Sequence, residues 1–105
     1  MDTEEYQKLA MRTASEKCYD LSNVGLGLAG ESGEVADLIK KHLHQGHDLD
    51  KDQLIKELGD ICWYIALCCE LMGMKLEDVL IGNVEKLKKR YPNGFNFTDS
   101  VNRKY

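Results

Sequence analysis

Apolar side chains recur at three- and four-residue spacing along most of the chain, which is the period of a helix. Side chains three or four positions apart share one face of a helix, so this spacing predicts amphipathic helices. The segments that carry it run from about 3–19, 24–43, 50–72 and 75–90. No segment shows the two-residue alternation of a strand. The pattern therefore predicts an all-α protein, a four-helix bundle.

Helix breakers and capping residues separate these segments. Gly46 and Gly73 follow the second and third, and Pro92 with Gly94 stops the fourth. Asp50 is a plausible N-cap for the third, because its carboxylate can accept the free N–H groups of a first turn. Residues 1–94 are expected to form a single all-α domain. Residues 95–105 show no period, and we expect a strap or a disordered tail there.

The second and third helical segments resemble each other. The two matching stretches are LAGESGEV (28–35) and LIKELGDI (54–61). Each contains two acids three residues apart: Glu31 and Glu34 in the first, Glu57 and Asp60 in the second. At about 100° per residue, the first acid of each pair falls within the apolar stripe of its helix, and the second lies about 60° away at its edge. Two helices with the same acidic flank suggest equivalent roles.

Four carboxylates on one shared flank point to a divalent cation. If the helices pack through their stripes the acids converge, and like charges a few ångströms apart disfavour ionisation. Oxygen ligands without histidine or cysteine favour Mg²⁺ or Mn²⁺. A ferritin-like di-iron site would require Glu-x-x-His pairs, which these segments lack. The alternative is a pair of solvated helix faces, but the repeated phase makes that reading less attractive.

Composition narrows the class of partner. The chain is 43% hydrophobic and 30% charged with a net charge of -4, which is ordinary for a globular protein and argues against general binding to nucleic acid or to an anionic membrane. The first residues have no apolar export segment, and no run approaches a membrane span. Four cysteines without CxxC spacing are expected to be small buried hydrophobes. We expect a cytoplasmic protein.

Three stretches together resemble the MazG-type nucleoside triphosphate pyrophosphohydrolases of the all-α NTP pyrophosphatase superfamily. They are GLAGESGEVADLIKK, KELGDICWYIA and NVEKLKKRYPNGF. The family pattern is an ExxE pair followed by an ExxD pair, which the four acids meet. The resemblance covers about residues 23–95.

This resemblance implies a fold and an activity. Family members form a four-helix fold that assembles into dimers or larger oligomers, so we expect a homodimer or homotetramer. They bind Mg²⁺ and hydrolyse a nucleoside triphosphate between the α and β phosphates, which yields the monophosphate and pyrophosphate. Carried over, the catalytic and metal-binding residues are Glu31, Glu34, Glu57 and Asp60. One of the glutamates could also orient or deprotonate the attacking water.

Cations for the phosphates are expected on the last helix and beside the third segment's acids. In the family the Asn-x-x-Lys…Arg-Tyr-Pro segment lies near the triphosphate, which gives Asn83, Lys86 and Arg90 as candidates, and Lys56 directly precedes Glu57. The alternative is that these side chains are solvated, since lysines near a helix C-terminus are favoured by the helix dipole.

Other residues off the stripes bear on assembly and on the ligand. Trp63 either packs in a subunit interface, the favoured reading, or stacks on a base. Gly33 and Gly59 suggest the close approach of a second subunit, and Gly27 could leave room for a ligand. Two competing functions remain: a non-catalytic helical adaptor for oligomerisation, and a nucleotide sensor that binds without turnover.

Overall fold

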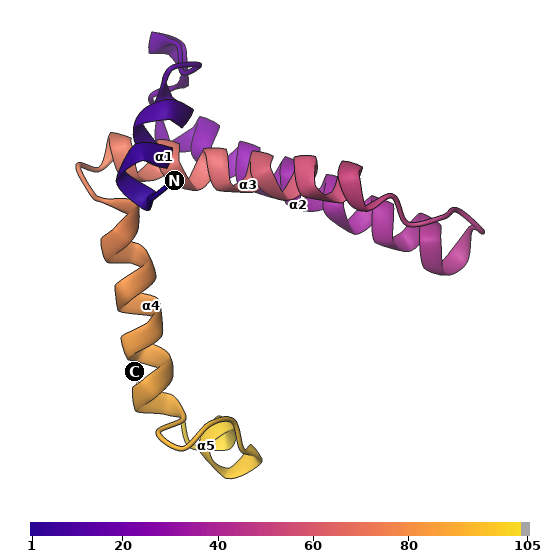
Figure 1. Ribbon diagram of the computed structural model, residues 1–105, viewed down its shortest axis with the longest axis vertical. Coiled ribbons are helices and arrows are strands. Elements are labelled where there is room, and N and C mark those ends of the chain that lie inside the picture. Colours follow the sequence, from indigo (N-terminus) through magenta and orange to yellow (C-terminus); the bar gives the residue numbers. More distant parts are fainter. Residues whose placement is uncertain (104–105) are drawn as a thin grey trace.

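Two long antiparallel helices form the main body of the molecule, and a further helix leaves one end of this hairpin (Figure 1). The computed structural model describes residues 1–103. Its elements are α1 (Thr3–Met11), the 3-10 turn η1 (Glu16–Cys18), α2 (Leu21–His44), α3 (Lys51–Leu71), α4 (Leu76–Arg90) and α5 (Phe97–Val101). No β-strand occurs among these residues. The predicted all-α class is confirmed.

The α2–α3 hairpin begins both of its helices with an aspartate cap. Asp20 accepts the N–H of Asn23 at 2.7 Å, and Asp50 accepts those of Asp52 and Gln53 at 3.0 and 3.2 Å. Such bonds satisfy N–H groups that have no partner within the helix. Between the helices, Gly46 takes a φ of 72°, a left-handed conformation that favours glycine. The predicted cap at Asp50 is thus confirmed, and α2 begins three residues earlier than its apolar period indicated.

The first helix is shorter than predicted, because α1 ends at Met11 instead of continuing to about residue 19. The hydroxyl of Thr13 donates to the carbonyl of Ala10 at 3.0 Å just beyond that end. Threonine and serine side chains compete in this way with the regular backbone pattern of a helix. The chain then forms η1 and turns into α2, so α1 is free to lie across α3.

The core is small and lies where α1, α2 and the start of α4 meet the second half of α3. Its buried side chains are Val24, Ala66, Leu67, Cys69 and Leu76. The expectation of buried cysteines holds for Cys69 but is wrong for Cys62, which is exposed.

Beyond its first turn, α4 leaves the hairpin and projects away from it (Figure 1). Five large apolar side chains of α4 are between 40% and 49% exposed: Val79, Leu80, Ile81, Val84 and Leu87. The radius of gyration is 16.8 Å, whereas a compact domain of this length has about 13 Å. A single chain therefore does not close the expected four-helix bundle.

A short helix follows the turn after α4. The side chain of Asn96 accepts the N–H of Asp99 at 2.7 Å and caps α5, an element that the sequence pattern did not reveal. The expected tail thus contains a capped helical turn, and residues 104–105 lie outside the described part of the chain. Within that part, no helix has the combination of length and apolar character needed to cross a membrane.

Candidate metal centre

Three carboxylates from α2 and α3 converge between the two helices. Glu31 comes from α2, Glu57 and Asp60 come from α3, and one oxygen of each lies within 4.8 Å of the others. Glu31 and Glu57 are half-buried and Asp60 is exposed. Antiparallel packing of the two helices through their apolar stripes is what brings these acidic flanks together.

Glu34, the fourth predicted acid, is placed differently. It is exposed and does not belong to the group of three mutually close oxygens. Its charge nevertheless contributes to raising the pKa of Glu31. The structure therefore brings three of the four predicted acids together and leaves the fourth at the edge of the cluster.

Glu31 is the acid of the cluster whose pKa is raised by its surroundings. Burial raises the pKa of its carboxyl, and the charges of Asp60, Glu57 and Glu34 raise it further, together with a hydrogen bond to Glu57. A carboxylate disfavours ionisation when it loses water and gains negative neighbours. A divalent cation would remove this penalty, and the donors fit one: all three are carboxylate oxygens, which Mg²⁺ and Mn²⁺ prefer.

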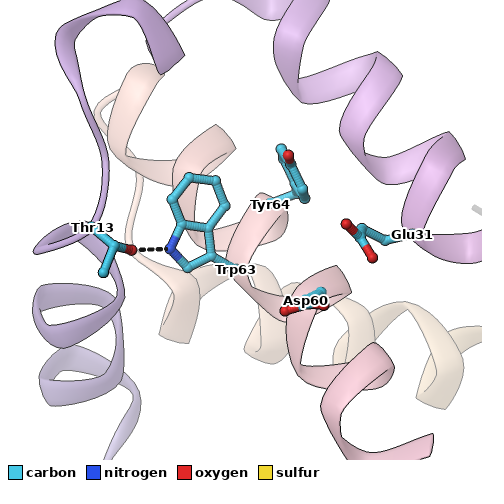
Figure 2. A pocket seen from close by; sticks show the side chains of 5 residues that line it. All are labelled: Thr13, Glu31, Asp60, Trp63 and Tyr64. Atoms are coloured by element: carbon cyan, nitrogen blue, oxygen red, sulfur yellow. Dashed lines mark hydrogen bonds between the residues drawn. The ribbon is translucent and has the colours of Figure 1, made fainter. Parts of the chain in front are cut away.

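A cavity of about 300 Å³ opens beside two of these acids (Figure 2). The residues that line it are Thr13, Glu31, Asp60, Trp63 and Tyr64. One wall is therefore acidic and the other aromatic, and Thr13 belongs to the segment that follows α1.

Trp63 is held within its own chain. Its indole N–H donates to the carbonyl of Ala10 and to the hydroxyl of Thr13, both at 2.9 Å. The ring also meets Tyr64 edge to face, with centroids 5.0 Å apart. The partner expected for Trp63 was a subunit interface or a base, whereas the indole N–H bonds to Ala10 of α1 and to Thr13 just beyond it.

Tyr64 occupies the space that was expected to be free beside Gly27. A Cβ atom on Gly27 would collide with the Tyr64 ring, so the prediction that this glycine leaves room for a ligand is wrong. In contrast, a Cβ on Gly33 or Gly59 would meet nothing within 4 Å in this chain. Their predicted contact with a second subunit stays a prediction.

Of the predicted phosphate-binding residues, the three on α4 lie apart from the acids. Lys56 is exposed on α3, Asn83 and Lys86 are exposed on α4, and Arg90 is half-buried at the end of α4. Because α4 projects away from the hairpin (Figure 1), one chain does not carry these α4 side chains to the acid cluster, and none of them lines the cavity beside it.

Sequence reasoning missed Thr13 and Tyr64 as residues of this site. Tyr64 follows Asp60 by four positions, so it shares the face of α3 that carries the acid. That spacing is a usable signal, although Tyr64 also falls at the helical spacing of the apolar residues of α3. Thr13 had no comparable signal, because its place depends on where α1 ends.

The chain is similar to proteins of known sequence over most of its length. Residues 20–95 match the MazG nucleotide pyrophosphohydrolase domain. Gene 37 protein of Mycobacterium phage L5 is 37% identical over 78 residues, which cover 70% of this chain and 68% of the phage protein. The uncharacterized protein YvdC of Bacillus subtilis (strain 168) is 44% identical over 74 residues, which cover 61% of this chain and 69% of YvdC. No solved structure matches. On the strength of the domain match, this chain belongs to the MazG nucleotide pyrophosphohydrolase domain family.

Proposed function

We propose that this protein is a Mg²⁺-dependent pyrophosphohydrolase that cleaves nucleoside triphosphates between the α and β phosphates. The observation that carries the proposal is the convergence of three carboxylates from two helices, with oxygens within 4.8 Å of one another. Such a cluster is unfavourable by itself, because burial and repulsion raise the pKa of Glu31. A bound dication would stabilise it and would also attract the phosphates that bare acids repel.

The metal-binding residues in this proposal are Glu31, Glu57 and Asp60, with Glu34 completing the set from the edge of the cluster. When bound, Mg²⁺, or Mn²⁺ in its place, would polarise the phosphoryl oxygens and lower the pKa of an attacking water. One of the glutamates would orient that water and accept its proton.

Assembly into a homodimer or homotetramer is part of the proposal. The apolar residues Leu80, Val84 and Leu87 recur at four- and three-residue spacing on α4, and all are more than 40% exposed. On the flank of the same stripe lie Asn83, Lys86 and Arg90. Packing of α4 against the hairpin of a second copy would bury the stripe and bring these side chains toward that copy's acids. Lys56 would contribute from α3 of the hairpin itself.

Incubation with a panel of nucleoside triphosphates tests the activity. We expect pyrophosphate and the monophosphate to appear with Mg²⁺ or Mn²⁺ and not with EDTA. Glu34→Gln and Asp60→Asn should each abolish the release of pyrophosphate. Glu85→Gln on α4 and Asp48→Asn in the α2–α3 connection are matched controls on exposed residues, and both should remain active. Activity that survives Asp60→Asn would contradict the metal-ligand assignment.

An adaptor is the second candidate function, because the exposed apolar face of α4 would also suit a helical oligomerisation module. Calorimetric titration separates the candidates. The enzyme should bind Mg²⁺ with a defined stoichiometry that Asp60→Asn eliminates, whereas an adaptor should show no such binding. A nucleotide sensor would bind the triphosphate and Mg²⁺ but release no pyrophosphate.

A further inference from the structure

The cavity beside the acids has an aromatic wall as well as an acidic one (Figure 2). Trp63 and Tyr64 stand nearly perpendicular, with an interplanar angle of 82°, and both line the cavity opposite Glu31 and Asp60. Its volume of about 300 Å³ is at the small end of ligand pockets, which suits one ring system better than a whole nucleotide. The cavity therefore places the proposed metal-binding acids next to two aromatic rings that could stack on a planar ligand.

The polar group of Trp63 is already engaged within the chain. The indole N–H of Trp63 is shared by the Ala10 carbonyl and the Thr13 hydroxyl. That hydroxyl in turn donates to the Ala10 carbonyl at 3.0 Å. The three groups satisfy one another, so Trp63 can offer a ligand its ring surface but not its hydrogen-bond donor. The same bonds hold the indole plane in one orientation.

We infer that Trp63 is a stacking platform for the nucleobase, that it accepts purines and pyrimidines alike, and that Thr13 is a positioning residue for it. The inference rests on the proposed function, because it assigns the base end of the same substrate. Stacking tolerates different bases because every base has a π-face. Discrimination between bases requires donors and acceptors that match a base edge, and the one hydrogen-bond donor of Trp63 is already bonded to Ala10 and Thr13.

Fluorescence can test the platform directly, because Trp63 is the single tryptophan of the chain. The probes are AMP, GMP, CMP and UMP, with ribose 5-phosphate as the ligand that lacks a base. We expect each monophosphate to quench the emission in the presence of Mg²⁺, with dissociation constants that agree within about tenfold, the scale of one favourable contact. Ribose 5-phosphate should leave the emission unchanged. An equal response to ribose 5-phosphate, or binding by calorimetry without any emission change, would overturn the platform.

Substitutions test the two residues separately by calorimetry. Trp63→Ala should weaken binding of AMP by about 10- to 100-fold, the usual range for loss of one stacked base. It should leave binding of ribose 5-phosphate within about twofold of its original value, since stacking requires a base. Trp63→Phe keeps a ring and should retain most of the affinity, which covers the case in which the alanine variant does not fold. Unchanged AMP binding in Trp63→Ala, or Trp63→Phe as weak as a folded Trp63→Ala, would refute the role.

Thr13→Val removes the hydroxyl and preserves the shape of the side chain. We expect a higher KM for the triphosphate with kcat within about twofold, because a platform that moves weakens ground and transition states alike. Thr98→Val on exposed α5 is the matched control and should change neither constant. An equal fall in kcat and kcat/KM for Thr13→Val would overturn the positioning role.

The failure of this inference and the failure of the proposed function have different signatures. If the protein releases no pyrophosphate, monophosphates and ribose 5-phosphate still report whether a base meets Trp63. Hydrolysis could proceed while the affinities for the four monophosphates differ by about a hundredfold or more, which corresponds to recognition of the base edge by hydrogen bonds. That result would support the proposed activity and refute the inference that Trp63 accepts all four bases alike.

Discussion

Two amphipathic regions differ in how far their apolar side chains are buried: the end of the hairpin near α1, and α4 beyond its first turn. At the hairpin end, α1 and α2 cover α3, and Ala66, Leu67 and Cys69 are almost completely buried. On α4, Leu76 alone is buried among residues 76–90, and Val84 in the middle of the helix remains 49% exposed. Both have apolar residues at helical spacing, yet one finds its partner within the chain and the other does not.

The acids of the candidate site lie on two helices that are neighbours in the chain, whereas the candidate phosphate-binding residues lie on α4, away from the hairpin. Two helices joined by a short connection are enough to bring Glu31, Glu57 and Asp60 together, because antiparallel neighbours need only a turn between them. The cationic side chains of α4 require another surface. Apolar area on this scale, left exposed, typically marks an interface. Within one chain the acids of α2 and α3 therefore meet, whereas the proposed phosphate-binding residues of α4 would reach such acids only in an assembly.

The largest expected effect comes from a charge on the exposed stripe of α4. Val84→Glu should prevent burial of that stripe, because an unpaired carboxylate in an apolar interface is costly. We expect the mass measured by light scattering to fall to that of a monomer. Pyrophosphate release should fall at least about a hundredfold, as expected when several charge contacts to a phosphate are lost.

Lys89→Glu is the control for this substitution, since it places the same acid on a different face of α4. It should preserve the oligomer. A wild-type protein that is monomeric at micromolar concentration would show that the exposed stripe of α4 does not mediate assembly.

Gly27→Ala tests how tightly the hairpin end is packed. The new Cβ atom would collide with the ring of Tyr64. Displacement of that ring should lower the free energy of unfolding by about 1–3 kcal/mol, the usual cost of overpacking, and should alter the emission of neighbouring Trp63. Denaturant unfolding measures the first effect and fluorescence the second.

Gly30→Ala provides the matched control on the same helix, because a Cβ there would meet nothing within 4 Å. Alanine is the better helix former, so this variant should be more stable by about 0.5–1 kcal/mol. Equal effects of the two substitutions would mean that Tyr64 does not rest on Gly27.

Gln7 of α1 connects the end of α3 with the start of α4. Its amide nitrogen donates to a carboxylate oxygen of Glu70 and to the carbonyl of Met74, both at 3.1 Å. Its amide oxygen accepts the N–H of Leu76 at 2.9 Å, where α4 has no capping side chain of its own. Gln7→Met should cost about 1–2 kcal/mol, because it leaves this N–H without its acceptor.

Hydrogen exchange should locate that loss at the first turn of α4, with faster exchange of the Leu76 amide. Gln53→Met at the exposed start of α3 should change the stability by less than about 0.5 kcal/mol. Unchanged exchange at Leu76 in the Gln7 variant would show that the hydrophobic contact of Leu76 is sufficient to hold α4.

The smallest expected effect is a pH dependence from Glu31. Because its pKa in the folded protein lies above the ordinary value of 4.5, the folded state binds this proton more tightly than the unfolded state does. The resulting contribution to stability is fully present below about 4.5 and is lost as the pH rises through the folded pKa. Without Mg²⁺, Glu31→Gln should therefore melt above the wild type at pH 7.

That difference in melting temperature should shrink as the pH falls toward 4, and Mg²⁺ at pH 7 should shrink or reverse it by stabilising the wild type alone. A difference that stays constant from pH 7 to pH 4 would show that Glu31 is not under electrostatic stress from its neighbours.

The amino-acid pattern was sufficient for features that depend on short-range spacing. Helical periodicity located α2, α3 and α4 to within about three residues. The two acid pairs at equal phase predicted that carboxylates of α2 and α3 would meet, and three of them do. Such predictions succeed because the rotation per residue of a helix is constant, so spacing along the chain determines which face a side chain occupies.

Other features required the tertiary structure, because they depend on which surfaces meet. From periodicity the first helix was expected to extend beyond Met11, where it ends. Periodicity also could not show that Ala10 and Thr13 would accept the indole N–H of Trp63. It could not show that the Tyr64 ring would fill the space beside Gly27. Nor could it show that α4, as amphipathic as its neighbours, would keep most of its apolar side chains exposed. Spacing defines the face of a helix, but contacts between distant segments decide what covers that face, and here they leave most of the apolar face of α4 exposed.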